Sequence, residues 1–315
     1  MASPLRLTIA SGYLPDDVAG LLADAAWTIV RGTFEVAEVA MSRFREDSEL
    51  TGLNRSSPGP ASSISRPLER ALAAADRARR VTGGRFDPRI VGALERIGYV
   101  GVPQGRVGSV RAPGDGERIL DREGRTGRVA LRRQVDLGGI GKGLALRWAA
   151  NALDASLGDA TNPPLAYLID AGGDIVGSGT PTAEEPWHVG IEDPSAGPDP
   201  VPAAVIAVVA VAGRGAVATS SVRRLRWEHD GTVVHHLIDP RTGEPGGDGI
   251  VAVTVAGPDP AWAEVWSKAL FLEGAGGIAD LARRRGLAAW WVTSGGALEM
   301  TPAARVRTVW VASEA

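Results

Sequence analysis

Short apolar strands and amphipathic helices follow one another along this chain without regular alternation, and this restricts the fold more than any other feature. Runs rich in Val, Ile, Leu and Ala predict strands at 5–10, 129–133, 165–169, 205–211, 233–237, 251–255, 288–292 and 306–311. Apolar residues at helical spacing predict helices over about 15–44, 67–80, 143–153, 261–272 and 277–285, the first of which Gly32 can interrupt. This mixed order indicates an α+β fold rather than an alternating α/β one.

The chain is long enough to bury a substantial core. Its 315 residues are 44% hydrophobic, which fits one large domain or two intimately packed subdomains. Gly, Pro and Arg are concentrated in segment 101–127, which predicts an exposed, mobile connection. We therefore expect residues 1–315 to form a single domain of two packed subdomains.

Charge and composition exclude several classes of function. The 34 basic and 37 acidic residues are scattered and give a formal charge of −3, so no basic block favours nucleic acid. The absence of cysteine excludes disulfides, thiolate metal sites and cysteine nucleophiles. Asp16, Asp17 and Asp24 interrupt the stretch where a signal peptide would be apolar, and no apolar run has the roughly 20 residues of a membrane span. We expect a cytoplasmic protein.

Only two of the basic residues are lysines, Lys142 and Lys268. Arginine and lysine differ chemically only at particular sites, so the two retained lysines are candidates for specific roles. Chance retention at surface positions is the alternative.

Five polar, glycine-containing segments accompany the apolar elements, at 44–54, 83–88, 136–143, 170–174 and 235–243. The backbone N–H groups of the glycine-rich turn 138–143 could cradle an anion. A Walker loop is excluded, because Asp136 stands where its first glycine is required and Gly143 where Ser or Thr is required; the glycine spacing of a dinucleotide fingerprint is not met either. In 235–243 a strand delivers a histidine into an Asp-Pro turn, for which a hairpin with a buried histidine is the alternative.

The segments also occur in a recognisable order. They read Asp-Ser-Glu-Leu at 47–50 with Asn54, Gly-Arg-Phe-Asp-Pro at 84–88, Asp-Leu-Gly-Gly-Ile-Gly-Lys-Gly at 136–143, Ala-Gly-Gly-Asp at 171–174, Ala-Thr-Ser at 218–220 and His-Leu-Ile-Asp-Pro-Arg-Thr-Gly at 236–243. This series, over roughly residues 40–275, resembles the ApbE family of FAD:protein FMN transferases. The resemblance implies a domain that binds FAD in a cleft and transfers FMN to a Ser or Thr hydroxyl of a partner protein, releasing AMP. Such transfer needs a positioned hydroxyl and a cation on the diphosphate.

The resemblance also assigns roles to single residues. Phe44 takes the place of an aromatic residue against the flavin ring, although a core Phe at the end of a helix is the alternative. Lys142 is implied as a diphosphate partner and His236 as the general base, or else as a structural hydrogen-bonding residue. The other residues implied to contact FAD are Arg85, Phe86, Asp87, Asp136 and Ile238. For Asp87, capping of the turn before Pro88 is the alternative.

The implied metal site departs from the family pattern. Members that transfer FMN hold Mg²⁺ with an Asp and a Thr four residues apart on one helix, together with a backbone carbonyl near the glycine-rich motif, here at Gly139. In this chain Glu264 and Lys268 occupy the Asp and Thr positions. Glutamate can still ligate Mg²⁺ and serve catalysis, but a charged ammonium has no lone pair to donate. The spacing predicts a Glu264–Lys268 ion pair, with Lys268 in place of the metal ion.

Two further departures bear on transfer. Ser221 stands where the family commonly has glycine, and the usual N-terminal Met-Gly-Thr segment is not evident. Because the ordered series of motifs is retained, an FAD:protein FMN transferase is the first functional hypothesis. A non-catalytic FAD-binding protein of the same fold is the second, and a flavin-free scaffold is a third that leaves the polar segments unexplained.

Overall fold

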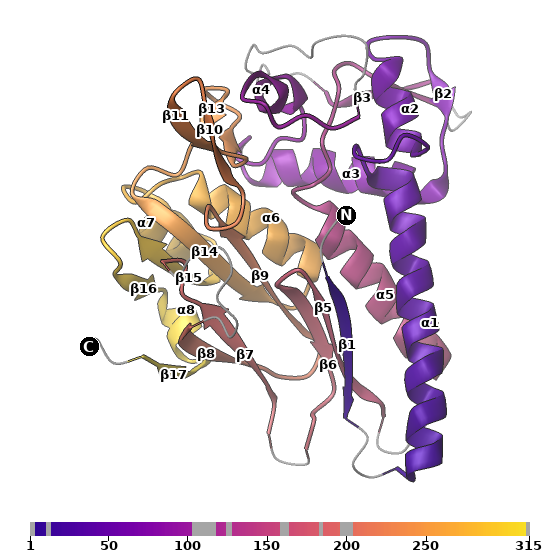
Figure 1. Cartoon of the computed structure of the whole chain (residues 1–315), viewed down its shortest axis with the longest axis vertical. Helices are drawn as coiled ribbons and strands as arrows, with labels where there is room; N and C mark the ends of the chain where they lie inside the picture. Colours follow the sequence, from indigo (N-terminus) through magenta and orange to yellow (C-terminus); the bar gives the residue numbers. More distant parts are fainter. Residues whose placement is uncertain are drawn as a thin grey trace.

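The computed structural model describes residues 4–10, 14–102, 118–123, 128–157, 164–182, 185–195 and 204–312. Its centre is a seven-stranded sheet in which every neighbouring pair is antiparallel (Figure 1). In spatial order the strands are β1 (Leu5–Ala10), β5 (Ala166–Ala171), β6 (Asp174–Ser178), β9 (Gly215–Ser221), β14 (Ile250–Gly257), β15 (Ala288–Thr293) and β16 (Leu298–Met300). An antiparallel sheet combined with helices is the α+β class that the sequence predicted.

The two faces of this sheet bury different layers. Helices α1 (Asp16–Met41), α5 (Gly141–Leu157) and α6 (Pro260–Phe271) cover one face, and the three-stranded sheet β17 (Thr308–Val311), β8 (Val205–Val211) and β7 (Trp187–Glu192) covers the other. Successive side chains of β5 point to opposite faces of the sheet. Tyr167 and Ile169 pack with the helices, whereas Ala166 and Leu168 pack toward β7 and β8.

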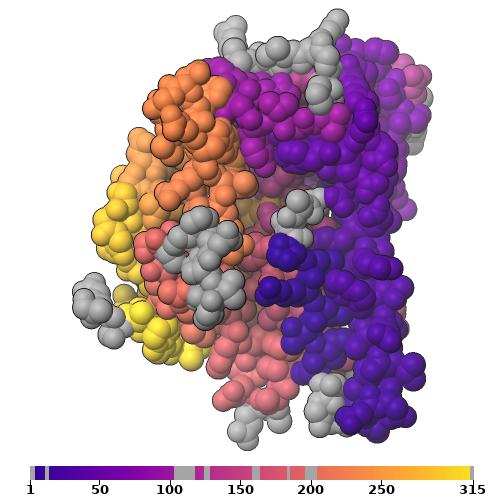
Figure 2. Space-filling view, viewed as in Figure 1, coloured from indigo at the N-terminus to yellow at the C-terminus, as the bar shows by residue number. Residues whose placement is uncertain are grey.

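A second group of elements covers the N-terminal ends of α5 and α6. It contains α2 (Glu49–Arg55), α3 (Arg66–Val81), α4 (Val91–Arg96) and a small sheet of β2 (Ser62–Ser63), β4 (Arg128–Leu131) and β3 (Leu120–Glu123). The hairpins β10 (Arg226–His229)–β11 (Thr232–His235) and β12 (Ile238–Asp239)–β13 (Glu244–Pro245) pack beside α4 (Figures 1 and 2). The indole N–H of Trp227 donates to the Ile97 carbonyl at 2.7 Å across this contact. The helices α7 (Ile278–Arg284) and α8 (Pro302–Arg305) complete the fold.

Two local predictions need correction. Helix α1 continues through Gly32, because its apolar face packs against α5 on both sides of that glycine. The predicted connection 101–127 contains β3, which pairs with β4, while 103–117 and 124–127 lie outside the described residues. In the described part of the chain, no helix has both the length and the apolarity needed to cross a membrane.

The crossing of α5 and α6 depends on a missing side chain. A β-carbon at Gly143 would lie 2.5 Å from the Ala261 α-carbon and 2.6 Å from the Pro260 carbonyl oxygen, so only glycine allows this approach.

We expect Gly143→Ala to lower the free energy of unfolding by about 1–3 kcal/mol, because the obstructing atoms belong to the backbone of α6 and cannot rotate away. Gly32→Ala is the matched control: a β-carbon there meets nothing within 4 Å, and alanine should stabilise the helix by about 0.5–1 kcal/mol. Urea unfolding of both variants measures the contrast. Equal effects would show that the helix crossing does not depend on Gly143.

Candidate active site

A buried ion cluster joins α5, α6 and β6. The Lys142 ammonium lies 3.0 Å from a carboxylate oxygen of Asp174 and 3.0 Å from Glu264 Oε1. Glu264 uses its second oxygen to accept the backbone N–H of Gly143 at 2.8 Å. Both carboxylates are almost fully buried, so they need the lysine charge to remain ionised. Desolvation opposes the charge on Lys142, but the two carboxylates outweigh it and raise the pKa of Lys142 above its ordinary value.

Hydroxyl groups hold the neighbouring strand and helix in place. Ser220 on β9 shares a hydrogen bond of 2.9 Å with Ser267 on α6. The backbone N–H of Thr219 donates to Asp174 at 3.1 Å, and the Thr219 hydroxyl contacts that of Thr254 at 2.9 Å. The Ala-Thr-Ser motif therefore fixes Asp174 and α6 relative to each other.

Lys268 differs from Lys142 in having no carboxylate partner. The expected Glu264–Lys268 pair does not form: among the described residues, no carboxylate oxygen lies within 4.0 Å of the Lys268 ammonium. The physical reason is that Glu264 turns toward α5, where Lys142 and the Gly143 N–H take both of its oxygens. The Lys268 stem instead lies over Gly139, where a β-carbon would come within 2.9 Å of Lys268 Cε.

Aromatic side chains form the next part of the site. Phe44 follows α1, is 49% exposed and meets the Tyr99 ring edge-on at 5.7 Å between centroids. Tyr99 stacks on Trp227 at 5.5 Å. The buried Arg43 guanidinium lies 4.5 Å from the Phe44 ring centre and forms an ion pair with Asp136. Asp136 is thereby engaged, and it also accepts the backbone N–H of Gly138 in the glycine-rich turn.

His236 lies beside these aromatic residues, 6.2 Å from the Tyr99 ring centre. Its Nδ1 is 3.4 Å from the Leu225 carbonyl oxygen. A carbonyl can only accept, so the proton of the neutral ring resides on Nδ1 and Nε2 keeps its lone pair. Desolvation, with a contribution from the charge of Lys268, lowers the pKa of His236 to about 3. The imidazole is therefore neutral at pH 7.

The 84–88 motif supplies both packing and ion pairs. Phe86 is buried, and its ring also approaches Gly139 beside the Lys268 stem. Arg85 pairs with Glu273, one of its two contacts being 2.9 Å. Asp87 accepts the backbone N–H of Arg89 at 2.9 Å and pairs with its guanidinium at 2.6 Å, so its carboxylate caps the turn across Pro88 rather than one before it.

Ile238 lies in the core rather than among the exposed groups. Its side chain is 1% exposed and packs with Ala93, Leu94, Ile97 and Val234. The side chain has no surface left for a ligand, so any contact from this residue must come from its backbone.

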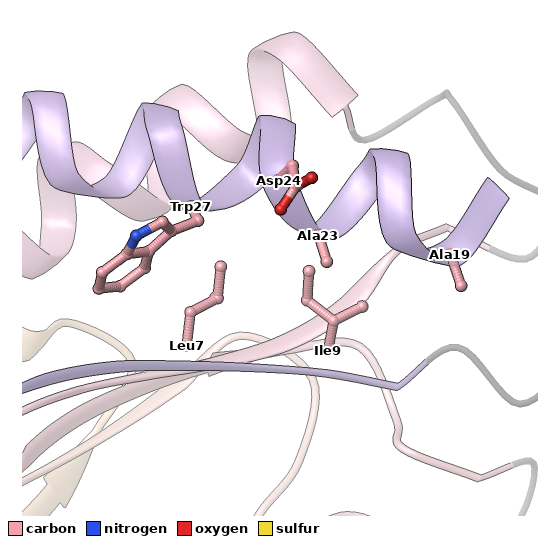
Figure 3. A pocket seen from close by; sticks show the side chains of 6 residues that line it. All are labelled: Leu7, Ile9, Ala19, Ala23, Asp24 and Trp27. Carbon is pink, nitrogen blue, oxygen red and sulfur yellow. The ribbon is translucent and has the colours of Figure 1, made fainter. Parts of the chain in front are cut away.

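One hollow of the described structure lies away from these residues. It has a volume of about 330 Å³ and opens between β1 and α1 (Figure 3). Its lining is mostly apolar, with Asp24 as the one carboxylate among Leu7, Ile9, Ala19, Ala23 and Trp27. None of the motif residues lines it, so the chemistry of the chain is concentrated away from this hollow.

A sequence model of the ApbE family matches residues 1–291. The chain belongs to the ApbE family. A protein of Salmonella typhimurium named FAD:protein FMN transferase is 33% identical over 162 residues, which cover 51% of this chain and 43% of that protein. A protein of Haemophilus influenzae with the same name is 26% identical over 297 residues, which cover 89% and 82%. The chain thus spans less than half of the first relative and most of the second.

Solved ApbE structures share the fold. The crystal structure of an ApbE protein from Thermotoga maritima superposes with a TM-score of 0.79 at 25% identity, covering 97% of this chain and 96% of that one. The flavin transferase ApbE from Vibrio cholerae gives a TM-score of 0.75 at 21% identity, covering 98% and 96%. The predicted resemblance and the α+β class are both confirmed.

Four residues of this ApbE-family site were not predicted to have a role. Arg43 and Tyr99 contact Phe44, Trp227 stacks on Tyr99, and Asp174 pairs with Lys142. Asp174 ends a motif that was recognised, so its position was available from the sequence. Tyr99 and Trp227 stand in no motif and meet only through the contact of α4 with β10.

The acid stability of this ApbE-family chain should depend on His236. The pKa of His236 is about 3 in the folded chain, against an ordinary value of 6.5. Between these two pH values the unfolded chain binds a proton on this histidine and the folded chain does not. The neutral His236 therefore contributes to the free energy of unfolding. The contribution is fully present above about pH 6.5 and is lost as the pH falls toward 3, at no more than about 1.4 kcal/mol per pH unit. Urea unfolding across this range should show a shallower loss for His236→Gln than for the wild type. The exposed His188 provides the control, and an unchanged slope in His236→Gln would contradict the prediction.

Proposed function

We propose that this chain is an FAD:protein FMN transferase, which moves the FMN half of FAD to a Ser or Thr hydroxyl of an acceptor protein and releases AMP. The names of its relatives support this reaction. The observation that carries the proposal is a neutral histidine, His236, whose pKa is lowered in part by the charge of Lys268, an ammonium that crosses Gly139 and has no carboxylate within 4.0 Å among the described residues. A proton acceptor and a cation are the two groups that transfer from a diphosphate requires.

The chemistry assigned to His236 is proton removal. The acceptor hydroxyl oxygen forms a bond to the FMN phosphorus, the bond from that phosphorus to the AMP oxygen breaks, and AMP leaves with the bonding electron pair. His236 Nε2 takes the hydroxyl proton, while the Leu225 carbonyl holds Nδ1–H and so fixes the ring. A neutral ring is required at the start of this step, and the lowered pKa of His236 supplies one.

The aromatic group fits the flavin. Phe44 exposes about half of its surface next to Tyr99, and an exposed ring of this kind can stack on the isoalloxazine. Phe86 would form part of the wall beside the glycine-rich turn. Lys142, by contrast, is assigned to positioning: its two carboxylate contacts hold Glu264 and Asp174, so a direct diphosphate bond would require it to leave them.

A second candidate, FAD binding without transfer, has one specific observation in its favour. Both oxygens of Glu264 are already occupied, and an ammonium stands where a metal-ligating hydroxyl would be needed. Binding could persist in such a site while transfer is slow.

The test is to incubate the purified chain with FAD and an acceptor domain that carries a flavinylation motif, with Mg²⁺ or with EDTA. AMP release measured by chromatography, together with covalent flavin fluorescence on the acceptor, is the expected result. An acceptor with its Ser or Thr changed to Ala is the control. FAD binding without AMP would support the second candidate and contradict transfer, and the absence of any FAD binding would contradict both.

A further inference from the structure

Lys268 is a desolvated ammonium on which the negative charges of Glu264, Asp174 and Asp136 act only from a distance, without a direct ion pair in the described part of the chain. The side chain is only partly exposed, and burial lowers the pKa of Lys268 below its ordinary value. The charge of the Lys142 ammonium is compensated by two carboxylates, each 3.0 Å away. Lys268 has no carboxylate within 4.0 Å in the described part of the chain. Removing an ammonium from water without a partner is costly. An anion bound at this point would recover that cost.

The surroundings of Lys268 place such an anion at the proposed site. The lysine stem crosses Gly139 and meets the ring of Phe86, and its charge contributes to the lowered pKa of His236. Two motifs of the family, 84–88 and 136–143, thus lie against this one side chain, and its charge acts on the histidine of a third, 236–243. A ligand that contacts His236 and the glycine-rich turn comes within reach of the Lys268 ammonium.

The residues present do not fit the divalent metal that the family resemblance implies. Both oxygens of Glu264 already accept hydrogen bonds from groups of the protein, one from the Lys142 ammonium at 3.0 Å and the other from the Gly143 N–H at 2.8 Å. Position 268 carries a cation instead of an oxygen donor, and its stem covers Gly139, whose carbonyl the resemblance assigns to the metal. Over the described ranges, no group of three or more His, Asp or Glu side chains is arranged to hold a metal ion.

We propose that the Lys268 ammonium is a built-in cation for the diphosphate of FAD, so that this chain binds FAD without a divalent metal ion. The inference rests on the proposed function for the identity of the ligand. Lysine binds phosphate as a point charge, which suits a diphosphate held by one ammonium. The contrasting role is purely internal: Lys268 would only balance the excess charge of Asp174 and Glu264 around Lys142, and the ligand would not touch it.

The test measures FAD affinity instead of activity. Isothermal titration of the full chain with FAD at neutral pH, in EDTA and in millimolar Mg²⁺, should give the same Kd. Lys268→Met keeps the stem and removes the charge, and it should raise the Kd about tenfold to a hundredfold in both buffers. Arg31→Met, which removes a positive charge from the exposed face of α1, should leave the Kd unchanged.

A second variant restores the oxygen donors that a divalent metal ion requires. Glu264→Asp with Lys268→Thr supplies two oxygen donors and frees the space over Gly139. In this double variant FAD binding should be weak in EDTA and should recover with Mg²⁺. Thermal unfolding of the unliganded variants shows whether each one folds, and the comparison of EDTA with Mg²⁺ on the wild type needs no variant at all.

Several results would overturn the inference. A wild-type Kd that weakens about tenfold or more in EDTA would show a metal requirement, while leaving the proposed function intact. An unchanged Kd in folded Lys268→Met would assign the lysine to internal charge balance alone. Failure of the wild type to bind FAD in either buffer would remove the proposed function together with the inference. Metal-independent binding without AMP release would support the inference and remove only the transfer reaction.

Discussion

Replacing His236 with glutamine should lower the rate of FMN transfer by about 10²–10⁴-fold while leaving the Kd for FAD nearly unchanged. Glutamine can still donate a hydrogen bond to the Leu225 carbonyl, which now receives Nδ1–H at 3.4 Å, but it cannot accept the proton of the acceptor hydroxyl. The loss should therefore appear in kcat and not in ligand affinity. Single-turnover AMP release and an FAD titration on the same preparation separate the two quantities.

His188→Gln is the matched control for this experiment. That histidine is exposed on β7, so its replacement should change neither transfer nor binding. If His236 only braced the Leu225 segment, His236→Gln would retain most of the transfer rate, because the amide preserves that contact. A retained rate in the folded variant would thus contradict the general-base role.

The elements that the sequence predicted are those whose side chains decide their structure. Strands β8 and β14 are apolar runs buried in the sheets, and α3 has a Ser65 cap, a proline in its first turn and a regular apolar face. Two of the elements that were missed have weak local signals. Strand β10 alternates between exposed and partly buried residues, and β3 is a short polar strand that exists because β4 pairs with it. Tertiary pairing decides these segments more than local preference does.

In the candidate site, too, local patterns could be predicted from the sequence, and contacts between elements could not. The motif segments could be collected from the sequence because each is a local pattern, and Phe86 and the Lys268 stem meet at Gly139 of the glycine-rich turn. The partner of Glu264 could not be predicted, because helical spacing shows only neighbours on the same helix. Lys142 approaches from α5, and that approach depends on the close crossing of two helices at Gly143. An ion pair between helices is set by packing, which periodicity does not report.

Lys142→Met should lower the free energy of unfolding by about 3 kcal/mol, and the loss should grow as the pH rises. The variant leaves the carboxylates of Asp174 and Glu264, with side chains 4% and 3% exposed, without the ammonium that lies 3.0 Å from each. Two buried like charges favour protonation of one of them, so the folded state of the variant binds a proton that the unfolded state has released. A group of this kind contributes stability at low pH that is lost on raising the pH through its folded pKa.

Removal of one of the two carboxylates provides the control for Lys142→Met. Adding Glu264→Gln to Lys142→Met removes one of the two negative charges, and the amide oxygen can still accept the Gly143 N–H that Glu264 Oε2 now accepts at 2.8 Å. The double variant should therefore recover part of the stability and lose the steep dependence on pH. Arg31→Met, with its exposed charge on α1, should leave stability within about 0.5 kcal/mol of the wild type. Urea unfolding at a series of pH values measures all three. If Lys142→Met unfolds like the wild type but binds FAD weakly, the ammonium serves the diphosphate directly and the two carboxylates do not depend on it for their burial.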